Sequence, residues 1–460
     1  MNSSWKRRLV LAAIAPLVAL AAPASLPVPP FDGLGITAVR AASPSAGEAR
    51  RRWERLCRIR KDKFDLVLPG AMRDHGIDMW IVMMKEGHYD PLYEDLGRGY
   101  PGRVGFYVFT DRGQGRIERA ALGVDGPLLE GCGAYDLFKP SDDLKAFVAE
   151  RAPKAIGVNL SDEIGSADGL SHTAYLELTK TLGEPWASRL ESAERLISAF
   201  RNRRVATEIA AFAEAGELSK EIAERALSNE VVTPGVTRLE DVAFWIQDQL
   251  LARGLGSSFD QPSVYITGPQ GNEDVSNARI IQRGDVVVID WGVCFLNLCT
   301  DMKRMAYVLK PGEAKAPASF QKAFDQAVKV REVIRANIKP GRRADETLAV
   351  LNREAEKAGF AIMKEFNKPM GGDTTDVIIG CHSVGNLGHG DGPSIAWFNP
   401  VRLTFTIEPT NLFSIEFFAY TPIPEWGGKK LRIPLEDDAI ATERGIEWLY
   451  PVNERIRLIG

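Results

Sequence analysis

The chain has 460 residues, of which 45% are hydrophobic and 26% are charged, and its formal net charge is −4 at neutral pH. This length predicts two or three domains, each with an apolar core of its own. Because Lys and Arg are scattered and the net charge is slightly negative, nucleic acid and anionic membrane surfaces are excluded as main partners. The sequence shows no repeat of about 20–50 residues, which excludes solenoids and propellers.

The N-terminus predicts an export signal. Lys6, Arg7 and Arg8 precede an apolar, alanine-rich run over Leu9–Leu26. A basic start followed by such a run is typical of a secretory signal, and the arginine pair favours the twin-arginine route to the bacterial periplasm or exterior. The alternative is an uncleaved membrane anchor, which prolines within the run disfavour. We therefore expect residues 1–42 to be a signal and flexible leader, and the mature chain to have no stable membrane span.

An α/β pattern begins near residue 48. Helical periodicity predicts helices over Glu54–Met72, Ser141–Arg151 and His172–Leu182. Apolar runs predict strands over Met79–Met84 and Ala155–Val158, with a hairpin formed by Gly105–Thr110 and Arg116–Leu122. This alternation predicts a first domain, residues 48–200, in which helices cover a small sheet.

A charged segment, Arg201–Arg204, marks the predicted boundary to a second domain over residues 201–460. The predicted helices here are Ala206–Leu227, Leu239–Arg253, Ser319–Asn337 and Ala344–Gly359. The chain then becomes rich in strand-forming sequence from Val401 to Trp448. Pairs of helices combined with antiparallel strands predict the α+β class for this domain.

The chain contains five cysteines, an odd number for an exported protein: Cys57, Cys132, Cys294, Cys299 and Cys381. No two of them form a C-x-x-C pair, which disfavours a zinc ribbon or a thioredoxin-type site. Their spacing does not indicate a disulfide pairing. We expect a buried free thiol at each position.

Two aspartates flank a predicted hairpin. Asp290 ends the apolar run Val286–Asp290, and Asp301 follows it by 11 residues. A turn around Phe295–Asn297 would place the two carboxylates side by side on adjacent antiparallel strands. A carboxylate at the end of a buried strand needs a cation, donors or water. The alternative is a turn aspartate together with a surface Asp–Arg pair.

Three further pieces carry metal-binding residue types. His382 and His389, two of only five histidines, lie in a glycine-rich segment, while Glu408 and Glu436 each follow a strand-like run. A glycine-rich connection with a structural histidine is the alternative for the first piece. Together with the two aspartates, these residues supply oxygen ligands and one imidazole that suit Mn²⁺, Co²⁺ or Zn²⁺.

In order and spacing these pieces resemble the five ligand motifs of the pita-bread superfamily, which includes methionine aminopeptidase, Xaa-Pro aminopeptidase, prolidase and creatinase. The motifs are Asp290-Trp291-Gly292, Asp301-x-x-Arg304, His382-x6-His389, Thr406-Ile407-Glu408-Pro409 and Glu436-Asp437-Asp438. The resemblance covers residues 201–460, and residues 48–200 are similar to the creatinase-like N-terminal domain of the Xaa-Pro branch. It implies a pita-bread catalytic domain. The sequence leaves the oligomeric state open, although similar two-domain relatives often form homodimers.

The resemblance also implies two divalent ions, Mn²⁺ in the first place with Co²⁺ or Zn²⁺ as alternatives. The implied ligands are Asp290, Asp301, His382, Glu408 and Glu436. Asp290 would bind one ion, His382 and Glu408 the other, and Asp301 and Glu436 both. The nucleophile would be a water or hydroxide between the ions.

Three more roles follow from the resemblance. Glu408 would accept the proton, His389 would stabilise the tetrahedral intermediate or position the scissile carbonyl, and Arg432 would support the acidic ligands.

The sequence keeps the five metal-ligand positions of the superfamily but differs from it at positions expected to contact the substrate. The loop Gly268–Asn277 has no histidine, Ile378 stands where Xaa-Pro enzymes carry one, and Pro434-Leu435 lengthen the step from Arg432 to Glu436. A peptide or dipeptide substrate, cleaved after its N-terminal residue and of the Xaa-Pro type, is expected from the domain layout. The alternatives are another dipeptide or small amide, a metal-binding relative without catalysis, and metal-free chemistry of the creatinase kind.

Overall fold

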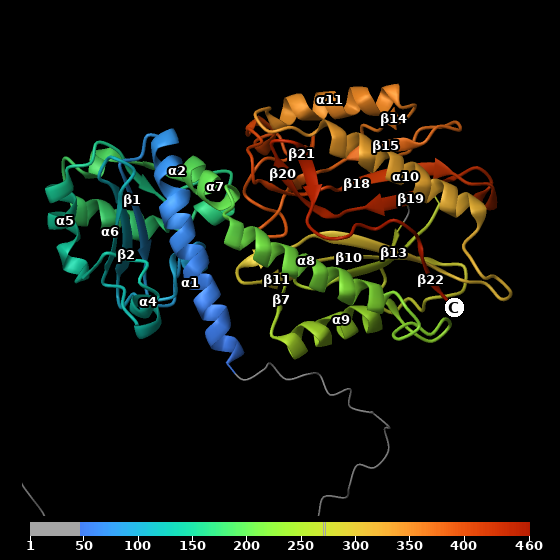
Figure 1. The fold of residues 1–460 in the computed structure, drawn as a ribbon, viewed down its shortest axis with the longest axis horizontal. Coiled ribbons are helices and arrows are strands. Elements are labelled where there is room, and N and C mark those ends of the chain that lie inside the picture. The colour runs from blue at the N-terminus through green and yellow to red at the C-terminus, as the bar shows by residue number, and fades with distance from the viewer. Residues whose placement is uncertain (1–46, 270, 272) are drawn as a thin grey trace, which may run out of the picture. The chain divides into compact units, whose positions relative to one another are not determined.

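The computed structural model describes residues 47–269, 271 and 273–460 (Figure 1). The predicted signal and leader, residues 1–42, lie outside this part of the chain. Among the described residues, none of the helices combines the length and apolar character needed to cross a membrane.

The first sheet has the strand order β4-β3-β2-β1-β5-β6, in which β1, β2 and β3 are antiparallel neighbours and the outer pairs are parallel. Its strands are β1 (Met79–Met84), β2 (Gly105–Asp111), β3 (Ile117–Leu122), β4 (Leu137–Lys139), β5 (Ile156–Val158) and β6 (Leu190–Ser192). The helices of this region are α1 (Glu48–Leu66), α2 (Leu68–Asp74), α3 (Tyr93–Leu96), α4 (Pro127–Cys132), α5 (Leu144–Arg151), α6 (His172–Leu182) and α7 (Glu194–Asn202). The predicted strands and hairpin are present.

One predicted helix, Glu54–Met72, is two helices in the structure. The helix is interrupted at Val67, between α1 and α2, and Pro69 lies in the first turn of α2. Proline lacks an N–H and is tolerated only in the first turn of a helix, so it starts a helix here instead of continuing one.

The remaining strands form four sheets, and none of them includes a strand of the first sheet within the described residues. The orders are β22-β13-β10-β8-β9, β12-β11-β7, β14-β15-β18-β19 and β16-β17-β20-β21. The strands are β7 (Gly256–Ser257), β8 (Ser263–Thr267), β9 (Glu273–Asp274), β10 (Val286–Trp291), β11 (Val293–Phe295), β12 (Leu298–Cys299), β13 (Met302–Val308), β14 (Ala361–Ile362), β15 (Asp376–Ile379), β16 (His382–Ser383), β17 (Leu412–Ser414), β18 (Phe417–Pro422), β19 (Lys430–Leu435), β20 (Asp438–Thr442), β21 (Gly445–Trp448) and β22 (Arg457–Ile459).

Two pairs of helices pack on these sheets: α8 (Ala206–Ala226), α9 (Leu239–Arg253), α10 (Ala318–Asn337) and α11 (Ala344–Lys357). Figure 1 shows α8 beside β11, α9 beside β7, and α10 beside β18 and β19. All four predicted helices are present, which agrees with the α+β prediction. The predicted domain boundary between residues 200 and 201 falls inside α7, and the division itself stays a prediction.

Strand β10 fixes the position of the Asp290 carboxylate at its end. Val286 and Val288 belong to the core that contains α10, while Val287 and Ile289 belong to the core that contains α8 and α9. Both faces of the strand are therefore covered, which accounts for its unbroken β-branched sequence. Asp290 follows Ile289 at the edge of this core, and the packing of the strand on both faces determines where its carboxylate lies.

Candidate metal centre

Strands β10 and β13 form the predicted hairpin and bring the two aspartates together. Asp290 lies opposite Lys303 in the antiparallel register, and Asp301 directly precedes β13. Carboxylate oxygens of Asp290, Asp301 and Glu436 all lie within 4.8 Å of one another. The backbone N–H of Asp301 also points toward the carboxylate of Asp438, at 3.3 Å.

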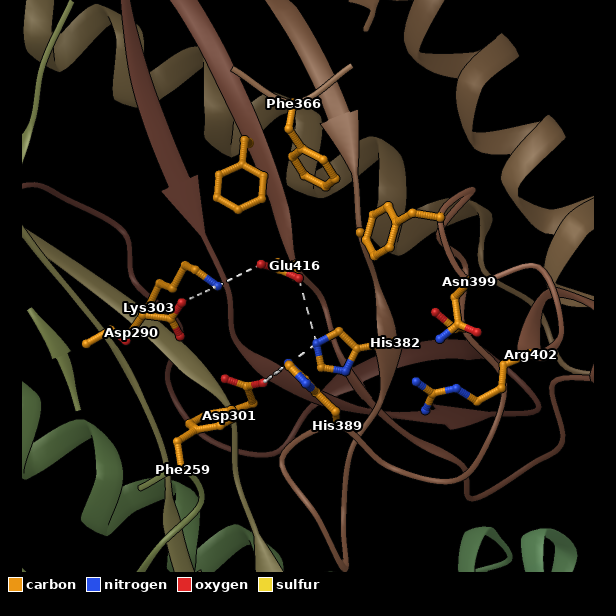
Figure 2. Close-up of a pocket in the computed structure, with 15 residues that line it drawn as sticks. Phe259, Asp290, Asp301, Lys303, Phe366, His382, His389, Asn399, Arg402 and Glu416 are labelled. Atoms are coloured by element: carbon orange, nitrogen blue, oxygen red, sulfur yellow. Dashed lines mark hydrogen bonds and ion pairs between the residues drawn. The ribbon is translucent and has the colours of Figure 1, made fainter. Parts of the chain in front are cut away.

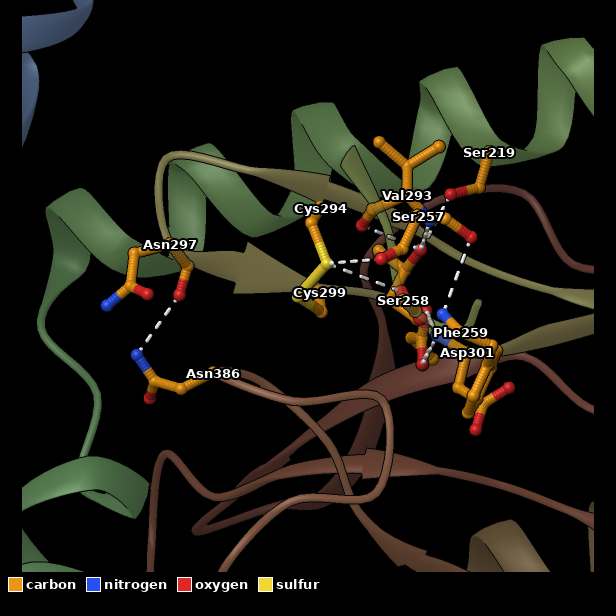
Figure 3. The surroundings of a disulfide bond; sticks show 12 residues. Ser219, Ser257, Ser258, Phe259, Val293, Cys294, Asn297, Cys299, Asp301 and Asn386 are labelled. Carbon is orange, nitrogen blue, oxygen red and sulfur yellow. Dashed lines mark hydrogen bonds between the residues drawn. A yellow bond between two sulfur atoms is a disulfide. The ribbon is translucent and has the colours of Figure 1, made fainter. Parts of the chain in front are cut away.

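A disulfide between Cys294 and Cys299 closes the loop of this hairpin (Figure 3). The two residues are direct partners in the antiparallel pairing of β11 and β12, so their side chains leave the same face of the ladder. Leu296 and Asn297 between them adopt positive φ angles of 52° and 62°, which makes the turn tight. The expectation of free thiols is therefore wrong for this pair, whereas the other three cysteines are free and buried.

A second hairpin supplies two glutamates. In the antiparallel pair β18–β19, Phe417 lies opposite Leu435. Glu416, just before β18, and Glu436, just after β19, therefore face each other beyond the ends of the strands. Glu436 also accepts a hydrogen bond from the Ser414 hydroxyl at 2.5 Å.

The imidazole of His382 completes the group, as Figure 2 shows for its contacts with Asp301 and Glu416. Its Nε2 atom lies 3.6 Å from Asp301 Oδ2, 3.7 Å from Glu416 Oε2 and 3.5 Å from Glu436 Oε1. Its Nδ1 atom lies 3.0 Å from the backbone carbonyl of Ser383, which favours the tautomer that leaves Nε2 unprotonated. We call the four carboxylates, Asp290, Asp301, Glu416 and Glu436, the acidic cluster.

The structure does not bring Glu408 into the acidic cluster, which corrects the ligand set taken from the sequence. Glu408 lies in a turn, where its backbone N–H donates to Asn411 Oδ1 at 2.8 Å. Its carboxylate accepts two hydrogen bonds from Arg203, at 2.6 and 3.0 Å. Glu416 stands where Glu408 was expected.

Sequence reasoning missed Glu416 although a signal for it existed. Ser414-Ile415-Glu416 repeats the pattern of Thr406-Ile407-Glu408 eight residues later. Only the later copy is followed at once by a long strand, and that strand forms a hairpin with the run that ends before Glu436. Hairpin symmetry around the Pro424–Gly428 turn would have paired the two glutamates.

Lys303 is the second residue that sequence reasoning missed. Its Nζ atom lies 3.1 Å from Asp290 Oδ2, 2.7 Å from Glu416 Oε1 and 2.5 Å from Glu436 Oε2. Burial disfavours its charge, but the surrounding carboxylates raise the pKa of Lys303 well above its usual value. Burial would raise the pKa of Glu436, yet the adjacent ammonium of Lys303 holds it below its usual value. The structure thus pairs a buried ammonium with ionised Glu436.

His389 and Arg432 have different environments. His389 Nε2 lies 3.6 Å from Asp301 Oδ2, and its ring contacts those of His382 and Phe259, so it adjoins the cluster as expected. Arg432 instead pairs with Glu273 and donates to Asn367, without a hydrogen bond or ion pair to the acidic cluster within the described residues.

The arginine behind the ligands is Arg304. Its Nη2 atom lies 2.7 Å from Asp437 Oδ1, and its Nη1 atom lies 3.4 Å from the backbone carbonyl of Glu436. Arg304 therefore fixes the segment that carries Glu436, a role that the sequence had suggested for Arg432.

One divalent cation fits among these residues. His382 Nε2 and Asp301 Oδ1 are buried, and among the described residues neither has a hydrogen-bond partner. Ligand atoms at about 2.1 Å from a tetrahedral ion lie about 3.4 Å apart, close to the separations between His382 Nε2 and the carboxylates. A second ion between Asp290 and Glu436 does not fit, because the Lys303 ammonium already contacts both.

The cluster lies at the base of a pocket of about 440 Å³. Its apolar wall is aromatic: Phe259, Phe366, Phe398 and Phe418. Asn399 and Arg402 supply polar groups on another side, as Figure 2 shows. A pocket with an aromatic wall and a charged base is suited to a small molecule or a chain end with an apolar side chain.

Comparison with known proteins supports the same fold. The chain is 29% identical over 199 residues to the uncharacterized peptidase YqhT of Bacillus subtilis, a match that covers 43% of this chain and 45% of that relative. The chain thus spans about half the length of this curated relative.

Solved structures match over most of the chain. The X-Pro aminopeptidase of Thermotoga maritima superposes with a TM-score of 0.57 at 16% identity, covering 85% of this chain and 98% of that one. The Xaa-Pro dipeptidase of Bacillus anthracis gives 0.56 at 19% identity, with coverage of 89% and 99%. The predicted pita-bread fold is confirmed by these matches. The sequence model of Metallopeptidase family M24 matches residues 210–443, about half of the chain, and the protein belongs to this family.

Proposed function

We propose that the protein is a divalent-metal-dependent peptidase that removes the N-terminal residue from peptides with proline in second position. The observation that carries this proposal is the joining of the acidic cluster and His382 at the base of an aromatic pocket. Family membership supports peptide hydrolysis. The similar solved structures of an X-Pro aminopeptidase and an Xaa-Pro dipeptidase support the choice of proline.

Asp301, His382, Glu416 and Glu436 would hold the metal ion. Their single imidazole and several carboxylates suit Mn²⁺, which we propose as the metal, with Co²⁺ or Zn²⁺ as alternatives. Such an ion supplies Lewis acidity toward a carbonyl and lowers the pKa of water. The predicted hydroxide between two ions would need a second metal position.

The side chains around this centre would serve binding and proton transfer. The resemblance assigned the role of proton acceptor to Glu408. We assign it to Glu416 instead, because Glu416 lies beside His382 whereas Glu408 is bound to Arg203. His389, 3.6 Å from Asp301, would donate to the oxygen on which negative charge develops. The aromatic wall would hold the apolar side chain and the pyrrolidine ring and exclude water around them.

A dipeptide substrate is a second candidate that one observation favours. Arg402 lines the pocket and supplies a cation that a free carboxylate would pair with. A dipeptide presents that carboxylate close to its scissile bond, whereas a longer peptide does not.

We also propose that the protein is exported and that it forms a homodimer. The disulfide between Cys294 and Cys299 supports export, because such bonds persist in oxidising compartments.

A peptide series tests the proposed activity. The Mn²⁺-loaded protein is incubated with Ala-Pro and Ala-Ala dipeptides and with longer peptides that begin with the same pairs, and released alanine is measured. We expect cleavage only of the proline series, and none by Asp301→Asn. Equal cleavage of the alanine series would overturn the proline requirement, and no cleavage at all would overturn the peptidase proposal.

A further inference from the structure

A lysine lies inside the group of residues that should bind metal. Lys303 is on β13, directly opposite Asp290, and its side chain is only 5% exposed. Its ammonium contacts Asp290, Glu416 and Glu436 at 3.1, 2.7 and 2.5 Å. The ring of Phe418 lies 5.5 Å from the same nitrogen and adds a cation–π contact. The surrounding protein is therefore built to hold a cation at this point.

Glu416 and Glu436 each place one carboxylate oxygen near the Lys303 ammonium and the other near the imidazole of His382. Glu416 Oε1 and Glu436 Oε2 contact Lys303, while Glu416 Oε2 and Glu436 Oε1 lie near Nε2 of His382. The cluster thus has two cation positions that share bridging carboxylates. One adjoins His382 and the other is taken by the ammonium of Lys303.

A metal ion and the ammonium cannot both occupy the position of Lys303. An ion bound by Asp290 and Glu436 would lie about 2.1 Å from oxygens that already accept from Nζ at 3.1 and 2.5 Å. The two cations would overlap or repel each other at very short range in a poorly solvated site. Burying the displaced ammonium elsewhere without its carboxylate partners would be costly.

We propose that this member of the family binds a single divalent cation, at the His382 position, and that the ammonium of Lys303 permanently replaces the second cation. Lys303 keeps Glu416 and Glu436 oriented from one side, as a second ion would, but supplies no open coordination position. This inference rests on the proposed metal-dependent function and narrows it to a centre with one ion.

Metal stoichiometry tests the proposal directly. The purified protein is saturated with Mn²⁺, freed of weakly bound ions by gel filtration, and analysed for manganese and protein content. We expect about one ion per chain for the wild type and about two for Lys303→Ser, which vacates the second position. Lys430→Met is the matched control, since it also removes a buried ammonium, one that pairs with Asp376 at the far end of β19. It should keep the wild-type value.

The electron paramagnetic resonance spectrum of the Mn²⁺-loaded wild type gives a second readout that does not depend on the folding of any variant. A mononuclear spectrum is expected, and an exchange-coupled spectrum would overturn the proposal. Two ions in the wild type, or one ion in both the wild type and Lys303→Ser, would also overturn it. A wild type that binds no ion would refute the metal-dependent function itself, which separates the two failures.

Discussion

At the residue scale, Glu416 and Glu408 offer a matched pair of substitutions. Both follow a polar residue and an isoleucine, but Glu416 faces His382 and Lys303, whereas Glu408 pairs with Arg203. We predict that Glu416→Gln lowers Mn²⁺ affinity more than about 100-fold, since removing even a partner of a ligand costs 10–100-fold. Glu408→Gln should leave the affinity unchanged. Titration calorimetry with Mn²⁺ measures both.

These two variants distinguish a ligand set that contains Glu416 from one that contains Glu408. Loss of Mn²⁺ binding in Glu408→Gln with retention in Glu416→Gln would overturn the assignment of Glu416 and restore Glu408 as the ligand. Circular dichroism of both variants checks that each is folded.

Asp90 gives a prediction about pH. It is 3% exposed and accepts hydrogen bonds from the backbone N–H of Leu92 and the amide of Asn159, each at 2.9 Å. Burial raises the pKa of Asp90 to about 6, in spite of these donors. The folded protein therefore binds this proton more tightly than the unfolded chain does. The stabilisation is complete below the unfolded pKa and is lost as pH rises through the folded one.

Comparison with Asp90→Asn isolates this contribution. The free energy of unfolding of the wild type minus that of the variant should fall by about 3 kcal/mol as pH rises from about 4 to about 7. Urea denaturation at several pH values in this window measures the difference. A difference that is independent of pH, or that grows with pH, would show that Asp90 is not destabilised by its burial.

At the element scale, the short hairpin β11–β12 should be the only covalently closed loop in the described chain. The disulfide joins residues 5 apart, and chain-entropy reasoning assigns about 2 kcal/mol to a loop of this size. We predict that the paired variant Cys294→Ser/Cys299→Ser loses about this amount of unfolding free energy. Thiol titration of the unreduced, denatured wild type should detect Cys57, Cys132 and Cys381 alone. Detection of all the cysteines would refute the bond.

The elements themselves show what local sequence can specify. Helices α6, α8 and α9 begin at the predicted residues, because apolar periodicity and turn residues mark their ends. The disulfide was not predicted, since it depends on the register of β11 and β12 rather than on cysteine spacing alone. Glu416 was missed for the same reason: which Ser/Thr-Ile-Glu segment reaches the site depends on how strands that are distant in sequence pair.

At the scale of the whole molecule, the carboxylates of the centre come from two hairpins, β10–β13 and β18–β19, and its imidazole comes from a separate strand, β16. Order and spacing predicted that Asp290, Asp301, His382 and Glu436 converge, and the structure brings them together. Lys303 stands beside Arg304 in the sequence, but the neighbouring residues do not indicate whether its side chain points into the protein or into solvent. Its direction follows from the pairing of Asp290 with Lys303 in a strand buried on both faces.

The loop that carries His389 is held by a buried arginine of α7, Arg201. Arg201 Nη1 lies 2.8 Å from Asp391 Oδ2, and its Nη2 lies 2.8 Å from Asp95 Oδ2. Asp95 belongs to α3, which lies between β1 and β2 in the sequence, whereas Asp391 lies two residues after His389. All three charged side chains are at most 7% exposed. This triad therefore couples the packing of the first region to the position of a pocket residue.

Removing Arg201 should be costly, because it leaves two carboxylates buried without their cation. We predict that Arg201→Met lowers the free energy of unfolding by about 3–5 kcal/mol. Arg50→Met should change it little, since Arg50 and its partner Glu54 are 80% and 52% exposed and solvent screens their attraction. Urea denaturation of both variants at neutral pH and low salt measures the contrast. If Arg201→Met/Asp391→Asn/Asp95→Asn regains most of the loss, the cost lies in the stranded charges; if it regains none, the arginine acts through packing instead.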